Sequence, residues 1–264
     1  LRTVTLPKSL AKIGSHAVEG CLSLREIIIP DGVSEIGDFV FRWCGVTKVT
    51  LPATLKKIPD ALFYSCSRLC SIVIPDTVEE IGAEAFCGTR LETITIPNNV
   101  TEIKKGALSS CGFRGNLFEK VKLPERQTVI VPYMFESCDW VTEVVIPSHI
   151  KKIAENAFSL CCNLEKLVIS DGVETIGAKA FGECRGLTEV VIPYSVTSVS
   201  ADTFGTTAYY DRSSLVSGHS FGCKNIKNLT VPTHIFSKGF FKFNWCDRLY
   251  AHEGIALIRT SKYM

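Results

Sequence analysis

The sequence has little net charge and no long apolar run. Its 29 Lys and Arg residues nearly balance its 27 Asp and Glu residues, which leaves a net charge of +2. This balance gives no electrostatic support for a nucleic-acid partner. No apolar stretch approaches the ~18 residues that a membrane-spanning helix requires. The composition therefore predicts no nucleic-acid partner and no membrane-spanning segment.

The sequence also lacks the motifs of common enzymes and metal sites. It contains no P-loop, no Gly-x-Gly-x-x-Gly run, no Gly-x-Ser-x-Gly elbow and no His-Glu-x-x-His pair. There are 12 cysteines and five histidines, but no Cys-x-x-Cys pair or Cys/His cluster that could begin a zinc site. We therefore expect no catalytic residues, no metal and no cofactor. A basic-then-apolar leader is also missing at Leu1, and we expect the chain to be part of a longer protein.

What the sequence does contain is one stretch that recurs along nearly its whole length. The stretch follows the template L-x-x-I-x-I-P-x-x-V-x-x-I-G-x-x-A-F-x-x-C-x-x, with Ser170 at the Pro position in residues 164–186. Most copies are 22–23 residues apart, a period in the leucine-rich-repeat range. The copies begin at Leu1, Leu24, Val46, Leu69, Leu91, Phe118, Val141, Leu164, Leu187 and Ile226, and a degenerate copy begins at Leu249.

Each part of the template predicts a local structure. The first seven positions alternate apolar and polar residues and are rich in β-branched side chains, which is typical of a short strand. The Pro that follows ends the strand, because it has no N–H to donate to a ladder. Glycines such as Gly37, Gly82 and Gly177 are expected to permit a tight bend. The A-F-x-x-C segment has room for no more than a helical turn, with its Ala and Phe in the core.

One copy cannot bury its apolar residues alone, so neighbouring copies must stack on each other. The predicted fold is a leucine-rich-repeat solenoid, a right-handed superhelix with a parallel β-sheet on its concave side and short strands and helical turns elsewhere. We expect a single domain over residues 1–264 with about ten repeats. Insertions are expected near 112–116 and at 205–220, and residues 249–264 form a cap-like end in which 256–258 add a last strand.

The cysteines and charges also follow the repeat. Most cysteines occupy the template Cys position, which predicts a column of small, buried, reduced side chains. Disulfides between stacked copies are the alternative, but in-register parallel side chains suit disulfide geometry poorly. Cys70 lies on the outward register of its strand and is the expected exposed thiol. Lys56 and Lys57 fall at the positions of Glu79 and Glu80 in the next copy, which predicts ion pairs between copies.

The signature I-P-x-x-V-x-x-I-G-x-x-A-F-x-x-C resembles the BspA-like class of leucine-rich repeats. Residues 73–86 are a close example of it up to the Phe, and the similarity extends over residues 1–248. The resemblance implies a bacterial or protozoan protein at the cell surface or secreted, with a role in adhesion. Its implied partner is a host or cell-surface protein or glycan.

Two surfaces are candidates for binding. On the sheet, valines at one outward position of consecutive copies form an apolar row with charged neighbours. At 205–220 the insertion carries aromatic residues with polar groups, a composition suited to recognition. Plain strand propensity explains the first surface equally well, and a tolerated loop explains the second. The candidate binding residues are Val145, Val168, Val191, Lys166 and Glu189 on the sheet, and Tyr209, Tyr210, Asp211, Arg212 and His219 in the insertion.

These observations favour a non-catalytic module that binds a protein or a glycan. An intracellular protein-interaction scaffold is the alternative, since reduced cysteines are compatible with that compartment. An enzyme with its site in the 205–220 loop is a third reading. A signal peptide or wall anchor in the full-length gene would separate the first two readings, and an activity dependent on His219 or Asp211 would support the third.

Overall fold

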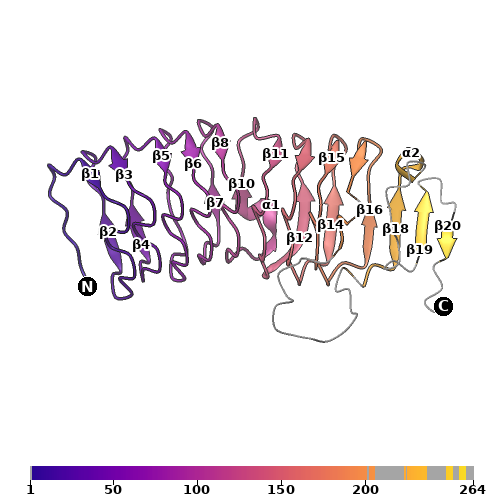
Figure 1. The fold of residues 1–264 in the computed structure, drawn as a ribbon, viewed down its shortest axis with the longest axis horizontal. Coiled ribbons are helices and arrows are strands. Elements are labelled where there is room, and N and C mark those ends of the chain that lie inside the picture. The colour runs from indigo at the N-terminus through magenta and orange to yellow at the C-terminus, as the bar shows by residue number, and fades with distance from the viewer. Residues whose placement is uncertain are drawn as a thin grey trace. The chain divides into compact units, whose positions relative to one another are not determined.

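The chain folds as a β-solenoid of about eight parallel-stacked turns, in agreement with the predicted fold class (Figure 1). Two compact units make up this computed structural model. Unit 1 comprises Leu1–Arg114 and Glu119–Gln127, and unit 2 comprises Gly115–Phe118 and Thr128–Met264. A single domain over 1–264 stays a prediction. The structure describes residues 2–200, 202–205, 223, 225–236, 248–251 and 256–259.

The start of most copies forms the predicted short strand, and we call these strands the first row. Pairing is parallel and in register, with Ile27 beside Val49 in unit 1 and Val145 beside Val168 in unit 2. The expected parallel sheet is divided into short ladders, because copies such as residues 69–75 form no strand in this row. In unit 1 the row contains β2 (Glu26–Ile28), β4 (Lys48–Thr50), β7 (Ile94–Thr95) and β10 (Val121–Lys122). In unit 2 it contains β12 (Val141–Ile146), β14 (Lys166–Ile169), β16 (Glu189–Val191), β18 (Asn228–Val231) and β19 (Arg248–Ala251), and β9 (Gly115–Asn116) of the insertion pairs with β12.

The ends of the chain and the first insertion add a few further elements. The expected last strand is confirmed as β20 (Ala256–Arg259), which pairs antiparallel with β19. The insertion near 112–116 continues into α1 (Leu117–Lys120), and α2 (Thr233–Phe236) follows β18. Each helix has four residues, and no helix in the described residues is long and apolar enough to cross a membrane.

A second row of two-residue strands, which the sequence did not predict, lies at the x-I positions just before the template Gly. Its strands also pair in parallel, and in Figure 1 those of unit 1 lie along the upper edge. In unit 1 they are β1 (Lys12–Ile13), β3 (Glu35–Ile36), β5 (Lys57–Ile58), β6 (Glu80–Ile81) and β8 (Glu102–Ile103). In unit 2 they are β11 (Val129–Ile130), β13 (Lys152–Ile153), β15 (Thr175–Ile176) and β17 (Ser198–Val199).

The A-F-x-x-C segment forms tight turns in place of the expected helical turn. From the first copy to the eighth, the residue before the template Ala and the residue before the template Cys both have positive φ. In the eighth copy these residues are Lys179 (φ 51) and Glu183 (φ 58). A non-glycine residue rarely adopts this left-handed conformation, so the stacked neighbours must hold it in place.

The template glycines have a different role from the one predicted. Gly37, Gly82 and Gly177 do not have positive φ, so the bend does not depend on them. They instead permit close approach of the previous copy: a Cβ on Gly177 would lie 2.7 Å from the Glu155 nitrogen. At these three positions glycine is therefore favoured by stacking rather than by turning, whereas other copies have Lys104, Val131 or Ala154 in its place.

Phenylalanine stacks form the centre of each unit. In unit 1, Phe63 lies parallel to Phe41 and Phe86, with ring centroids 5.5 and 5.6 Å apart. Parallel stacks in unit 2 join Phe135, Phe158, Phe181 and Phe204 at 5.3–5.8 Å. All of these rings are fully buried. Burial of large rings, rather than partner recognition, accounts for the recurrence of Phe in the template.

The cysteine column is confirmed for the described residues. The template cysteines from Cys44 to Cys223 are buried and form no disulfide. Thiols that donate to carbonyl groups of the previous copy are those of Cys44, Cys66, Cys111, Cys161, Cys184 and Cys223. Cys66 Sγ lies 2.9 Å from the Phe41 oxygen, and Cys184 Sγ lies 3.1 Å from the Phe158 oxygen. Burial raises the pKa of Cys66 to about 12 and that of Cys111 to about 12, so both thiols stay protonated donors.

A thiol reagent is expected to label one to three cysteines in the native protein and all twelve after denaturation. The thiolate is the reactive form, and buried thiols with a raised pKa supply almost none of it. Cys70 is exposed and should react first. Mass spectrometry of the labelled protein would provide the count. Fewer than eight free thiols in denaturant would contradict a column of reduced cysteines.

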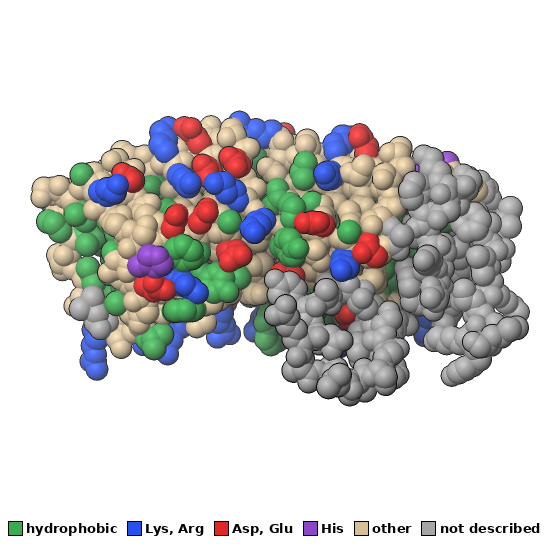
Figure 2. Space-filling model, viewed as in Figure 1, with side chains coloured by type: hydrophobic (Ala, Val, Ile, Leu, Met, Phe, Trp, Pro, Cys, Tyr) green, Lys and Arg blue, Asp and Glu red, His purple; other side chains and the backbone are tan. Residues whose placement is uncertain are grey.

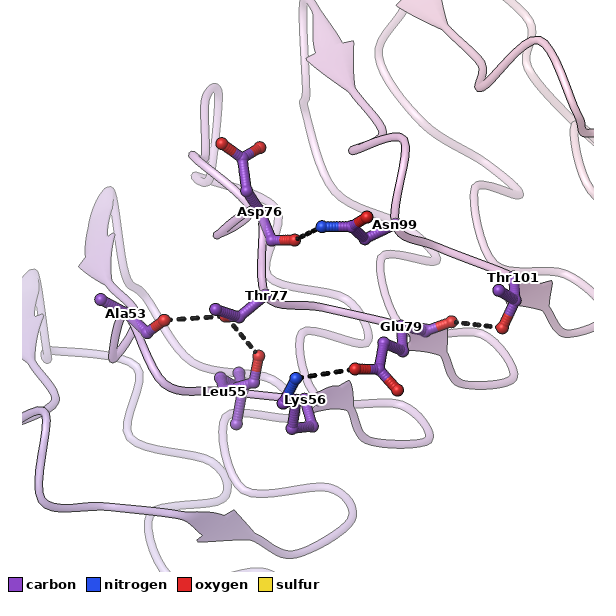
Figure 3. A network of polar contacts seen from close by, with 8 residues as sticks. All are labelled: Ala53, Leu55, Lys56, Asp76, Thr77, Glu79, Asn99 and Thr101. Carbon is purple, nitrogen blue, oxygen red and sulfur yellow. Dashed lines mark hydrogen bonds and ion pairs between the residues drawn. The ribbon is translucent and has the colours of Figure 1, made fainter.

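Polar contacts join neighbouring copies along the surface. The predicted ion pairs are present, with Lys56 Nζ 2.7 Å from Glu79 Oε1 and Lys57 Nζ 3.1 Å from Glu80 Oε1. Figure 3 shows the first of these pairs beside the Thr77 hydroxyl, which lies 2.8 Å from the carbonyl oxygens of two residues of the previous copy. Figure 2 shows basic and acidic side chains close together on the same face of unit 1. Exposed pairs of this kind add little stability, about 0–1 kcal/mol each.

Candidate binding surface

The first-row strands of unit 2 present an exposed row of valines. Val145, Val168 and Val191 occupy the same outward position in three consecutive copies, and Val145 is the direct ladder partner of Val168. Val168 is 39% exposed and Val191 is 45% exposed, whereas Val145 is half-buried. Strand alternation produces this row, because the residues on either side of each valine point into the core. We call these three residues the valine row.

Charged side chains border the valine row one strand position away. Lys166 Nζ lies 2.5 Å from Glu143 Oε1, so two neighbouring strands are joined beside the row. Glu189 is exposed in β16 and pairs in the ladder with Asn228 of β18. The structure thus places the five predicted sheet residues on neighbouring copies of unit 2, as an apolar strip with a charged border.

An aromatic residue that the sequence analysis did not single out lies in the same copy as Val191. Tyr194 follows β16 and is 51% exposed, and its ring centroid is 6.5 Å from that of His234. The His234 Nε2 atom is 2.8 Å from the Val196 carbonyl oxygen. The signal was visible in the sequence, because a large aromatic residue directly follows the template Pro.

The five predicted residues of the insertion lie outside the described residues. They are Tyr209, Tyr210, Asp211, Arg212 and His219. In the part of the chain that the structure describes, no group of three or more His, Cys, Asp or Glu side chains is placed to hold a metal ion.

A second exposed cluster, in unit 1, was also missed. It contains Trp43, which is 45% exposed, and the guanidinium of Arg42, which lies over the Trp43 ring. The signal was again available, since most copies place a small or polar residue at the position of Trp43.

The chain is similar to several solved bacterial repeat proteins. It matches a leucine-rich repeat protein from Bacteroides ovatus at 25% identity with a TM-score of 0.70, covering 93% of this chain and 65% of that one. A leucine-rich cell surface protein from Faecalibacterium prausnitzii matches at 21% identity and a TM-score of 0.52, covering 93% of this chain and 78% of that one. The pneumococcal vaccine antigen PcpA matches at 19% identity and a TM-score of 0.59, covering 87% of this chain and 62% of that one. No curated protein matches the sequence.

These similarities define the fold and the family. The last two structures are less than 25% identical to this chain and support the fold alone. The chain spans 65% of the Bacteroides ovatus protein, so it corresponds to part of that molecule. The BspA type leucine-rich repeat region matches residues 1–114 and 112–214, in six copies. Because this match extends over most of the sequence and the predicted repeat is present in the structure, the chain belongs to the BspA-type leucine-rich repeat family.

Proposed function

We propose that this chain is a non-catalytic binding module whose partner, a host or cell-surface protein or glycan, contacts the valine row. The observation that supports this most is the position of the row. Val168 and Val191 are exposed at equivalent places in adjacent copies, and Val145 extends the strip by one strand. An exposed apolar strip with a polar border is typical of an interaction site.

The border of the strip also suits recognition. Many protein interfaces combine an apolar centre with a charged, solvent-accessible rim. Lys166 and Glu189 have this position beside the valine row, and Lys166 is held by its ion pair with Glu143. Tyr194 adds an exposed aromatic ring in the copy of Val191, and tyrosine is one of the residues enriched at binding hot spots.

A location at the cell surface or outside the cell is part of the same proposal. One similar structure is a cell surface protein and another is a vaccine antigen, and we extend a surface location from them to this chain as part of the proposal. The alternative is an intracellular scaffold, and the buried reduced thiols are compatible with it. A signal peptide or wall anchor encoded with this chain would favour the surface location.

Replacing all three valines of the row by threonine is expected to weaken binding at least about tenfold. The change removes three methyl groups from the contact, each with a transfer free energy of about 0.8 kcal/mol. Threonine already occupies this strand position as Thr50, Thr95 and Thr230, so the fold should be retained. Binding would be measured against an array of extracellular-matrix proteins and glycans, and then by titration of the strongest hit.

Val73→Thr is the matched control. Val73 occupies the same template position in unit 1 and is 83% exposed, so its replacement changes a valine that is more accessible than those of the row but lies away from it. The control should bind like the original chain. Equal affinity of the triple variant and the original chain would show that the valine row is not the binding surface.

A further inference from the structure

The second copy of the repeat carries large aromatic residues at both of its left-handed positions. Phe39 has φ 61 and Trp43 has φ 58. In most other copies the position of Trp43 holds glycine or serine, as in Ser65, Ser110 and Ser137, and the exceptions are Leu160 and Glu183. All of the first eight copies have positive φ at these two positions, so what sets this copy apart is that large aromatic residues, which rarely adopt this conformation, occupy both. Neither core packing nor the template explains why this copy has two of them.

These residues belong to a cluster that extends over three consecutive copies. The guanidinium carbon of Arg42 is 3.8 Å from the centroid of the Trp43 ring, 5.4 Å from that of Tyr64 and 5.5 Å from that of Phe39. The His16 ring stacks on Phe39 at 4.9 Å with an interplanar angle of 7°. Figure 2 shows a histidine among hydrophobic, basic and acidic side chains on this part of unit 1. We call His16, Glu19, Phe39, Arg42, Trp43 and Tyr64 the Arg42 cluster.

The charge of Arg42 is only weakly compensated within the cluster. Its Nη1 atom lies 3.4 Å from Glu19 Oε1, a long contact, while Oε2 of the same carboxylate is 2.5 Å from His16 Nδ1. The Nε atom of Arg42 is buried and has no hydrogen-bond partner among the described residues. The Glu19 carboxylate is thus shared, and most of the guanidinium donors are not used. A planar guanidinium of this kind is suited to binding a carboxylate through two parallel hydrogen bonds.

We propose that the Arg42 cluster binds a saccharide that carries a carboxylate, of the uronate or sialate class. A single acidic sugar satisfies both features of the site. Its carboxylate accepts hydrogen bonds from the terminal nitrogens of Arg42, and its C–H face packs on the exposed edge and face of Trp43. An acidic peptide would need two separate residues for these contacts. The cluster lies in unit 1, so this site is additional to the valine row and does not depend on it.

The test uses two acids, sialyllactose and tri-galacturonate, each paired with its own methyl ester, which keeps the sugar skeleton and removes the charge. Isothermal titration with the complete chain should show binding of at least one acid, at least tenfold weaker binding of its neutral counterpart, and weaker binding at high salt.

Arg42→Gln and Trp43→Ser should each lower the affinity for the acid at least tenfold. Serine is the residue of other copies at the position of Trp43, so this variant keeps the fold. Arg185→Gln and Trp140→Ser, which change an exposed arginine and tryptophan of unit 2, should have no effect.

Several results would overturn the proposal. The proposal fails if neither acid binds, if a neutral sugar binds as tightly as its acid, or if both cluster variants keep the original affinity. A hexaglutamate peptide that binds more tightly than the sugars would assign the cluster to an acidic protein partner instead. The triple variant of the valine row should bind the acidic sugars normally, so the two proposals can fail independently.

Discussion

Replacement of Phe158 by alanine is expected to lower the free energy of unfolding by about 3–5 kcal/mol. The Phe158 ring is fully buried between Phe135 and Phe181, at centroid distances of 5.4 and 5.3 Å. Its removal would leave a cavity in the middle of the stack and remove ring contacts on both sides. The midpoint of urea unfolding, followed by circular dichroism, would measure the loss.

Phe158→Leu is the graded control for this prediction. The fifth copy already has a leucine, Leu108, at the same template position, and it is buried there. Leucine fills most of the space but cannot stack, so the loss should be clearly smaller than for alanine. If the alanine variant unfolded within about 0.5 kcal/mol of the original chain, the stacked rings would not be the core of unit 2.

Replacement of Gly177 by alanine is expected to destabilise unit 2 by about 1–3 kcal/mol through overpacking. The added Cβ would lie 2.7 Å from the Glu155 nitrogen and 2.8 Å from the Ala154 carbonyl carbon. Both are backbone atoms, so relief requires the two copies to move apart. That movement would weaken the bond from the Gly177 nitrogen to the Ile153 oxygen, which is 2.8 Å long. Thermal unfolding would detect the change as a lower Tm.

Gly14→Ala is the matched control, because Gly14 has the same template position as Gly177 but no neighbouring atom that an added Cβ would meet. No atom lies within 4 Å of a Cβ placed on Gly14, and this residue does not have positive φ. Its Tm should be unchanged or slightly higher, since alanine restricts the unfolded chain. An equal loss in both variants would mean that the glycine is needed for the bend, as the sequence alone had suggested.

The fold was predictable because the period and the alternation are each repeated many times. One copy such as residues 164–186 contains too few apolar residues to define a structure, but ten copies in register leave only stacked strands as a solution. The buried cysteines and the ion pair of Lys56 with Glu79 followed from the same register. In each case, residues at equal template positions lie next to one another.

Finer features were missed because the template does not encode them as a pattern. The second strand row has only two residues per copy, as in Glu80–Ile81, which is too short for alternation to be recognised. The left-handed positions hold residues as different as Lys179 and Trp43, so no common residue type reveals them. Glycine at the Gly177 position can be explained by a tight bend or by close approach of the previous copy, and only the distance to that copy distinguishes the two explanations.

The candidate sites were predictable to different degrees. The valine row was found because consecutive copies repeat an apolar residue at an outward position. The Arg42 cluster was missed because its residues have different template positions, so that only the stacking of three copies brings His16, Arg42 and Tyr64 together. The recurrent residues thus build the scaffold, and the residues that depart from the template supply the surfaces offered to partners.

The most direct test of the proposed binding surface is a methyl NMR titration of the chain with ¹³C-labelled valine. The partner would be the strongest hit from the matrix-protein and glycan array, and the resonances would be assigned with the single valine-to-threonine variants. We expect the methyl signals of Val168 and Val191 to shift on saturation, while that of the exposed Val73 stays in place. A titration that shifts Val73 and leaves Val168 and Val191 unchanged would contradict the proposed surface.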